Sequence, residues 1–199
     1  MTELEAVNYL LGILGSSPVG ALTNKNPDVA VAQQALDGAI VSVTSDGFWF
    51  NEVYNVDFVP SEIDGKISTT GYTKLITRNY YGVVRGNNFL FDPKNNTYVW
   101  ENTVTADAVA ILDFTDLPDI VQQAVQFFAA TQLCSSDLED ATKLSEQQGF
   151  YNNAYIQMVK DDLQIKRINR LTSPRVALAL RRVTPARLGS RNGPNFGGR

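Results

Sequence analysis

The 199-residue chain combines 44% hydrophobic with 19% charged residues and a net charge of −4, a balance typical of soluble globular proteins with one proper core. It has no histidine and a single cysteine, Cys134, which excludes Ser-His-Asp and Cys-His catalytic groups, His-based or four-thiolate zinc sites, and an internal disulfide. The lack of an internal disulfide fits assembly in a reducing cytoplasm. No run approaches the roughly 20 apolar residues of a membrane span, so we expect no membrane partner.

The chain opens with a strong helix signal. Thr2 and Glu5 form a Thr-x-x-Glu capping box, in which each side chain can satisfy the other's free backbone amide. Gly15 can take the left-handed conformation that ends a helix. Apolar residues between these signals recur at the spacing of one helical face, namely Val7, Leu10, Leu11 and Leu14. The pattern predicts a first helix between the capping box and Gly15.

A second helix is predicted to begin at Asn26, which suits the N-cap position, with Pro27 as its first helical residue. Gly47 is expected to end it. Its inward face is predicted to consist of Val29, Ala32, Leu36, Ile40 and Val43.

Aromatic and β-branched residues dominate the next part of the chain, from Phe48 to about Phe114. Turn sequences interrupt them around Gly65, Gly86 and Asn95. This alternation predicts an antiparallel β domain of four to six short strands. The strand candidates are residues 48–59, 73–79, 88–91, 98–100 and 106–114.

Helical patterning returns after Pro118, where an apolar stripe runs from Ile120 to Leu133, and a last helix is predicted over residues 137–168. The predicted fold class is therefore α+β: a helical bundle of about four helices with an inserted antiparallel β domain and an extended C-terminal arm. The predicted domains are the helical bundle at 1–47 and 116–168, the β insert at 48–115, and the basic arm at 169–199.

The end of the chain differs from the body in charge. Residues 1–165 hold all 21 acidic and eight basic residues, a formal charge of −13, whereas residues 166–199 hold nine basic residues and no acidic one. Apolar residues at a spacing of two in the arm suit a strand that adds to the edge of another sheet; a disordered, solvated tail is the alternative. The residues that we predict to bind a partner protein are Arg167, Arg170, Arg175, Val176, Leu178, Leu180, Arg181, Arg182 and Arg187.

No catalytic site is expected, because the chain lacks a Walker-type phosphate loop and a Gly-x-Ser-x-Gly nucleophile elbow. No carboxylate pair stands out; Asp161 and Asp162 are adjacent on a helix and expected to be solvated. Two rival functions remain open: a cell-wall polysaccharide hydrolase, and a sequence-independent nucleic-acid-binding protein that uses the basic arm. The −13 body would repel DNA, which favours a protein partner for the arm.

The order of several short motifs is also informative. Ala-Val-Asn at 6–8 opens a short helix that ends in glycine before Pro-Val at 18–19, and Gly-Phe-Trp-Phe-Asn at 47–51 follows the second helix. Leu-Phe-Asp at 90–92 marks a hairpin, and Phe114 with Leu-Pro at 117–118 marks the entry to the third helix. In these motifs the chain resembles the tail tubular protein A family (adaptor or gatekeeper) of short-tailed bacteriophages, the podoviruses. The family's Gly-Trp-x-Phe-Asn segment has its tryptophan displaced by one position here.

The resemblance implies a structural virion protein without assigned catalytic residues or a cofactor. It implies a dodecameric ring of identical subunits, placed under the portal protein and above a tail nozzle of the tail tubular protein B type, with tail fibres attached nearby in some relatives. The implied role is to join the tail to the portal, to retain the genome, and to let genomic DNA pass through the lumen without specific binding.

Overall fold

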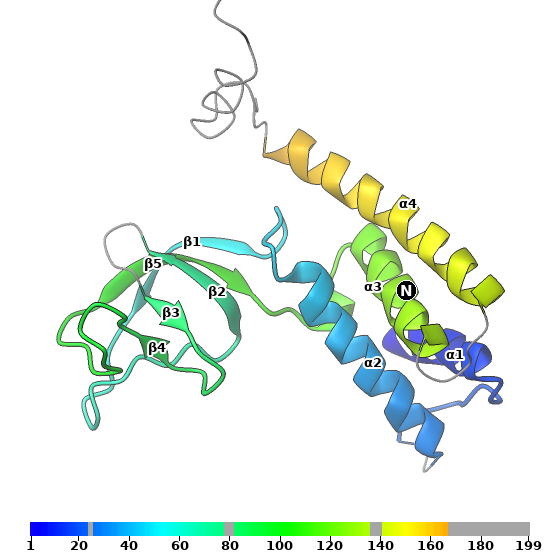
Figure 1. Cartoon of the computed structure of the whole chain (residues 1–199), viewed down its shortest axis with the longest axis horizontal. Coiled ribbons are helices and arrows are strands. Elements are labelled where there is room, and N and C mark those ends of the chain that lie inside the picture. The colour runs from blue at the N-terminus through cyan, green and yellow to red at the C-terminus, as the bar shows by residue number, and fades with distance from the viewer. Residues whose placement is uncertain (24–25, 78–81, 136–140, 167–199) are drawn as a thin grey trace, which may run out of the picture. The chain divides into compact units, whose positions relative to one another are not determined.

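The computed structural model describes residues 1–23, 26–77, 82–135 and 141–166. Within these ranges it has four α-helices, one short 3-10 helix and five strands, so the fold class is α+β, as predicted (Figure 1). The chain divides into two compact units, residues 1–162 and 163–199, and the first unit holds every strand of the described ranges.

Helix α1 (Glu3–Leu14) is capped as the sequence predicts. The Thr2 hydroxyl accepts a hydrogen bond from the Glu5 amide at 3.2 Å, and the Glu5 carboxylate accepts one from the Thr2 amide at 2.7 Å. Hydrogen bonding of the Glu5 carboxylate to Thr2, first to its amide and then to its side chain, lowers the pKa of the Glu5 carboxyl. At the other end Gly15 has a φ of 77°, the left-handed conformation expected there.

Helix α2 (Pro27–Thr44) begins with Pro27, and the Asn26 side chain accepts a hydrogen bond from the Asp28 amide at 3.0 Å. Both features confirm the predicted start. The helix ends at Thr44 with Ser45 as its C-cap, earlier than predicted. Gly47, with a φ of 86°, instead directs the turn that leads out of the helix.

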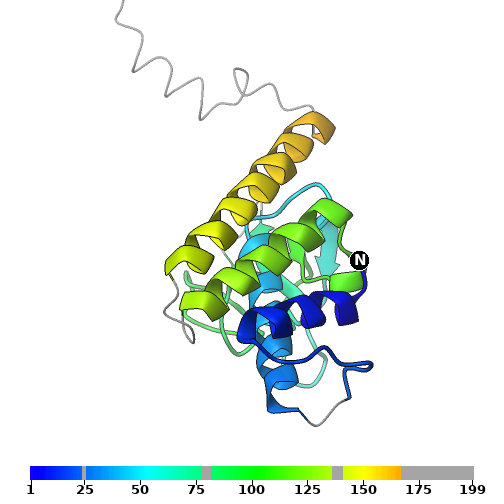
Figure 2. The same ribbon diagram turned by 90° about the vertical axis from the view of Figure 1, so that its right-hand side faces the viewer.

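Helices α3 (Asp119–Leu133) and α4 (Ala141–Ile165) complete the helical part, with the 3-10 helix η1 (Phe114–Asp116) before α3. Pro118 occupies the N-cap position of α3. Figures 1 and 2 both show α4 alongside α3. The predicted last helix, 137–168, is thus confirmed over 141–165, and its predicted ends partly fall outside the described residues.

A single hydrophobic cluster holds the helices together. It contains the predicted inward faces of α1 and α2, except that Leu14 is only partly buried. Fully burying one such side chain contributes about 1.5–3 kcal/mol relative to leaving it exposed. The largest fully buried side chains of this cluster are Val7, Leu10, Leu11, Val29, Leu36, Val121, Val125 and Met158.

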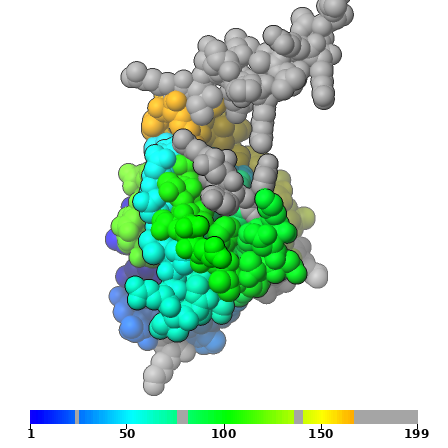
Figure 3. Space-filling model, turned by 90° about the vertical axis from the view of Figure 1, so that its left-hand side faces the viewer, coloured from blue at the N-terminus to red at the C-terminus, as the bar shows by residue number. Residues whose placement is uncertain are grey.

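The strands form two antiparallel sheets among the described residues. The three-stranded sheet has the order β1-β5-β2, and β3 pairs with β4 in the second sheet. Figure 3 shows the side of the molecule where these segments, coloured cyan to green, lie nearest the viewer. The strands are β1 (Glu52–Phe58), β2 (Tyr72–Thr77), β3 (Val83–Val84), β4 (Leu90–Phe91) and β5 (Val104–Ala110).

Several predicted strand boundaries are wrong. The predicted strand at 48–59 starts too early, because the Phe48 carbonyl accepts the amides of Asn51 and Glu52 in a turn before β1. The predicted strand at 106–114 instead runs from 104 to 110. Residues 98–100 form no strand; the structure has only an isolated bridge between Lys66 and Val99 there. The two-residue strand β3 was too short to give a sequence signal.

A second hydrophobic cluster underlies the strands. Trp100 is buried in it, and its indole N–H donates a hydrogen bond to the Leu90 carbonyl at 3.0 Å. The cluster consists of Phe58, Ile67, Leu75, Leu90, Trp100, Val104, Ala106 and Ala108. The described side chains thus form two separate cores, while the division into a bundle of 1–47 with 116–168 and an insert of 48–115 stays a prediction.

Candidate functional site

The nine partner-binding residues predicted in the arm, from Arg167 to Arg187, all lie outside the described residues. Their role stays a prediction. Within the described ranges, no group of three or more His, Cys, Asp or Glu side chains is placed to hold a metal ion. No helix of those ranges is both long and apolar enough to cross a bilayer. Cys134 is buried at the end of α3, where it packs as a small hydrophobic residue.

Asn51, at the point where the chain passes from α2 into β1, has a buried side chain that forms three hydrogen bonds. It is only 1% exposed. Its Oδ1 accepts a hydrogen bond from the Phe48 amide at 2.8 Å. Its Nδ2 donates to the carbonyl of Thr44 at 3.0 Å and to that of Ala110 at 3.1 Å. One buried amide therefore joins the end of α2 to the end of β5, the two segments through which the chain enters and leaves the strands.

The backbone of this junction is bonded as well. The Ala110 amide donates to the Asn51 carbonyl at 2.9 Å, which doubles the link between the two segments. The Trp49 amide donates to the Asp162 carboxylate on α4 at 2.8 Å. The expectation that Asp162 is merely solvated is therefore wrong, because its carboxylate receives a hydrogen bond from a residue distant in sequence.

Three consecutive aromatic residues, 48–50, surround this junction, and the structure shows which of them faces the core. Phe48 is buried at 6% exposure, whereas Trp49 and Phe50 are only partly buried. The Phe48 ring stacks on Phe50 with centroids 5.9 Å apart and meets Tyr155 of α4 edge-on at 6.5 Å. The displaced tryptophan thus leaves the central core position to phenylalanine.

Helix α4 is held to the other helices mainly by aromatic contacts. Phe150 lies 5.3 Å from Phe127, between ring centroids, and Tyr151 lies 5.1 Å from Phe128. The Tyr9 hydroxyl donates a hydrogen bond to Gln147 at 2.9 Å, and burial of the ring raises the pKa of the Tyr9 hydroxyl. Only three of the 25 residues of α4 are buried, so most of its surface is at least partly exposed.

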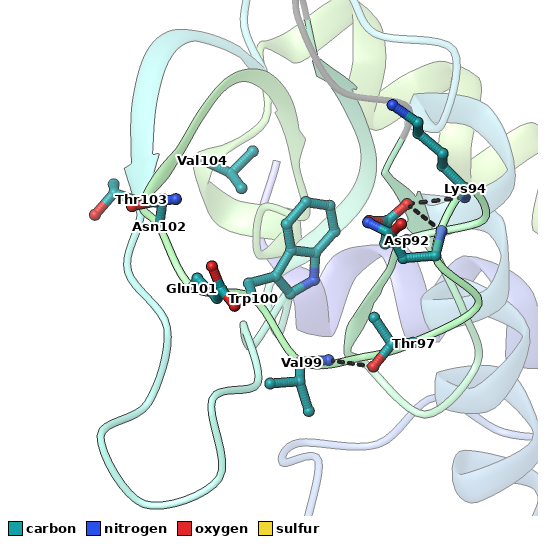
Figure 4. A pocket seen from close by; sticks show the side chains of 10 residues that line it. Asp92, Lys94, Thr97, Val99, Trp100, Glu101, Asn102, Thr103 and Val104 are labelled. Carbon is teal, nitrogen blue, oxygen red and sulfur yellow. Dashed lines mark hydrogen bonds between the residues drawn. The ribbon is translucent and has the colours of Figure 1, made fainter.

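The β part contains a pocket of about 770 Å³ formed entirely by residues 92–104 (Figure 4). The Trp100 indole lies between the two sides of this segment. The Asp92 carboxylate accepts a hydrogen bond from the Lys94 amide at 2.8 Å and one from the Asn95 amide at 3.3 Å. Desolvation opposes ionisation, yet these bonds prevail and lower the pKa of Asp92. The pocket lining combines polar side chains, such as Asp92 and Thr97, with the apolar side chains of Val99 and Val104.

Strand β1 and the neighbouring strand β5 carry several hydrogen-bonded carboxylates. The Tyr54 hydroxyl donates a hydrogen bond to the Glu52 carboxylate at 2.5 Å, which raises the pKa of Tyr54 to about 12. The Asp57 carboxylate accepts a hydrogen bond from Thr105 at 2.6 Å, and the Asp107 carboxylate accepts one from the Asn55 amide at 3.0 Å. Carboxylates on β1 and β5 thus give the surface of these strands a negative charge, as the −13 body predicts.

Sequence reasoning identified the segment 47–51 only as a motif and gave Asn51 no role. The available signal was its short polar side chain directly after three aromatic residues, where the helix and strand patterns meet. The partners of that side chain at Thr44 and Ala110 are 7 and 59 residues away, so local patterning could not reveal them.

Comparison with known proteins gives a consistent result. The family model described as tail tubular protein matches residues 4–173. Tail tubular protein A of Klebsiella phage KP34 is 32% identical over 142 residues, which cover 69% of this chain and 74% of that protein. The matched range begins at the second residue of α1 and includes all the other helices and strands of the described residues.

Proposed function

Because this chain belongs to the tail tubular protein family, it is a structural component of the phage tail in the virion, and we propose that it is the adaptor that joins the portal to the tail nozzle. The observation that carries the proposal is the family match, which spans both the helical core and the strand core. The relative in Klebsiella phage KP34 bears the name tail tubular protein A, and we propose the adaptor role for proteins of this type.

The adaptor is proposed to work as a ring of twelve copies. A ring requires two complementary faces on each subunit, and α4 supports such a face because it exposes apolar side chains. Phe150 is 41% and Ile156 50% exposed. The helical bundle is proposed to contact neighbouring copies and the portal. The β insert, with turns at Gly65, Gly86 and Asn95, is proposed to contact the nozzle and any tail fibre.

The charge of the body supports the proposed passage of DNA. Residues 1–165 carry a formal charge of −13, and carboxylates repel the phosphate backbone. A lumen with acidic walls would hold no phosphates, so the duplex would slide instead of binding. The proposed function therefore includes retention of the genome by the assembled ring and its later release without specific DNA contacts.

The basic arm is proposed to bind a neighbouring adaptor or portal subunit. Its arginines can pair bidentately with carboxylates, and the acidic body supplies these in every copy. We expect deletion of residues 169–199 to reduce tail assembly while the monomer stays folded. Deletion of residues 189–199 alone is the matched control, because it removes the glycine-rich end and keeps the alternating apolar segment.

The measurement is complementation of a phage that lacks the gene, scored by the fraction of particles with complete tails. Normal tails without residues 169–199 would contradict the assigned role of the arm. A salt-sensitive DNA gel shift by the full-length protein that disappears with the arm would instead support the nucleic-acid-binding alternative, which the seven arginines of residues 169–199 favour.

A further inference from the structure

A groove of about 430 Å³ lies on the helical part, apart from the junction and the β pocket. It is formed by the start of α1, the C-terminal half of α2, and the segment 111–115 that leads from β5 to α3. Its volume lies within the range of pockets that hold bound groups. All three elements belong to the first compact unit of the chain.

The groove combines an apolar surface with unneutralised carboxylates. Val41 is 42% and Ile111 41% exposed, so both present apolar surface at the groove. Glu3, Asp37 and Asp113 also line the groove. The carboxylates of these three residues form no hydrogen bond or ion pair with any other residue in the described part of the chain. The fitting occupant is therefore an extended segment with apolar and cationic side chains.

The arm of the same protein has this chemistry. Residues 175–183 read Arg-Val-Ala-Leu-Ala-Leu-Arg-Arg-Val, with Val176, Leu178 and Leu180 at a spacing of two and Arg175 and Arg181 flanking them. In an extended segment, that spacing places the three apolar side chains on one side. Nothing acidic occurs from residue 166 onward, so the segment has no internal partner for its charges.

We propose that this groove binds residues 175–183 of a neighbouring copy of the chain. The apolar side chains cover Val41 and Ile111, while the flanking arginines pair with the carboxylates of Asp37, Asp113 and Glu3. From Lys166 to Arg175 the chain can span about 30 Å at 3.3 Å per residue, and the proposal requires this stretch to bridge to an adjacent copy. The inference rests on the proposed ring, because it needs adjacent copies.

The edge of β1 is a weaker candidate for the same segment. Strand addition requires a regular edge, and the register of β1 shifts between Val53 and Val56. Asn55 at this bulge has a φ of 54°, and its amide already donates to Asp107. Such bulges disfavour the pairing of a further strand. The groove has no such obstacle.

Site-directed cross-linking tests the proposal on the full-length protein. Val41→Cys and Leu180→Cys are introduced together, and a short bismaleimide is added to the protein alone and to the protein mixed with portal. The matched control is Val31→Cys with Leu180→Cys: Val31 is on the same helix and 41% exposed, but about 15 Å away along the axis. Cys134 remains in both proteins because it is buried.

The proposal predicts a ladder of dimers and larger species on a denaturing gel for the Val41 pair and its absence for the Val31 pair. A charge reversal, Asp37→Arg with Asp113→Arg, is expected to abolish the ladder, and Arg175→Asp with Arg181→Asp in the same chain to restore it. Equal cross-linking of the two pairs, in both samples, would overturn the inference. A fast-migrating monomer would also overturn the inference, because it would show a cross-link within one chain and thus each arm in its own groove.

Electron microscopy of the same samples separates this inference from the proposed function. A ring on the portal without the ladder would leave the adaptor role intact and refute the groove as the binding site. A ladder without any ring on the portal would support the groove as the binding site of the arm and refute the adaptor role.

Discussion

Replacing Asn51 by alanine tests the account of the junction between helices and strands. The substitution removes the acceptor of the buried Phe48 amide and both donors, to Thr44 and to Ala110. A buried donor left unsatisfied costs about 1–3 kcal/mol, and each ordinary hydrogen bond contributes about 1 kcal/mol. The Thr44 carbonyl still accepts the Gly47 amide at 3.2 Å, so it is not left unsatisfied. We expect Asn51→Ala to lower the free energy of unfolding by about 3 kcal/mol.

Urea and thermal denaturation followed by circular dichroism measure this change. For a chain of this length, about 3 kcal/mol corresponds to a fall in Tm of roughly 6–12 °C. Asn8→Ala is the control, because the Asn8 side chain also exchanges two hydrogen bonds, with Val19, but is only partly buried. We expect it to cost about 1 kcal/mol. Equal, small effects of the two substitutions would refute the reasoning that burial makes Asn51 special.

A second variant, Asn51→Asp, adds a test with a definite sign. One carboxylate oxygen would face the carbonyl oxygens of Thr44 and Ala110, so the fold favours the protonated form and the pKa of the introduced carboxyl is raised. Its protonated form can donate one of the lost bonds. Relative to Asn51→Ala, this variant gains stability at acidic pH and loses it as pH rises above about 3.9, the unfolded value. A difference between the two variants that does not depend on pH would contradict this.

Two further substitutions test local features. Gly47 and Gly71 both have a φ of 86°. A Cβ on Gly47 would lie 2.8 Å from a methyl group of Val109, whereas a Cβ on Gly71 would meet open space. In denaturation experiments we therefore expect Gly71→Ala to lower the free energy of unfolding by about 1 kcal/mol and Gly47→Ala to lower it clearly more. Tyr54, with its pKa raised to about 12 by the bond to Glu52, stabilises the fold below about pH 10 and loses this contribution as pH rises toward 12. Tyr54→Phe should abolish the highest step of the tyrosinate absorbance titration; an unchanged titration would refute that assignment.

Local chemistry made the helices predictable. The capping box of Thr2 and Glu5, the N-terminal Pro27 and the left-handed Gly15 all act within a few residues, and the structure confirms each. The burial of the α2 face follows from the 3.6-residue period alone. These features can be predicted from the sequence because they depend only on residues that are close together in the chain.

The strands and the junction depended on distant partners. Residues 48–51 have strand-like composition, yet the turn that they form is fixed by bonds of Asn51 to Thr44 and Ala110. Trp100 also has a strand-like sequence around it, but its indole is tied to the Leu90 carbonyl across a hairpin. The groove between α1, α2 and residues 111–115 likewise exists only when segments far apart in sequence meet. Patterning along the chain carries no information about such contacts.

The adaptor role is tested most directly by electron microscopy of the full-length protein mixed with its portal. The account predicts closed rings of twelve subunits seated on the portal, with an open lumen along the common axis. Portal particles that remain bare at saturating protein, or a protein that binds only as scattered single copies, would contradict it.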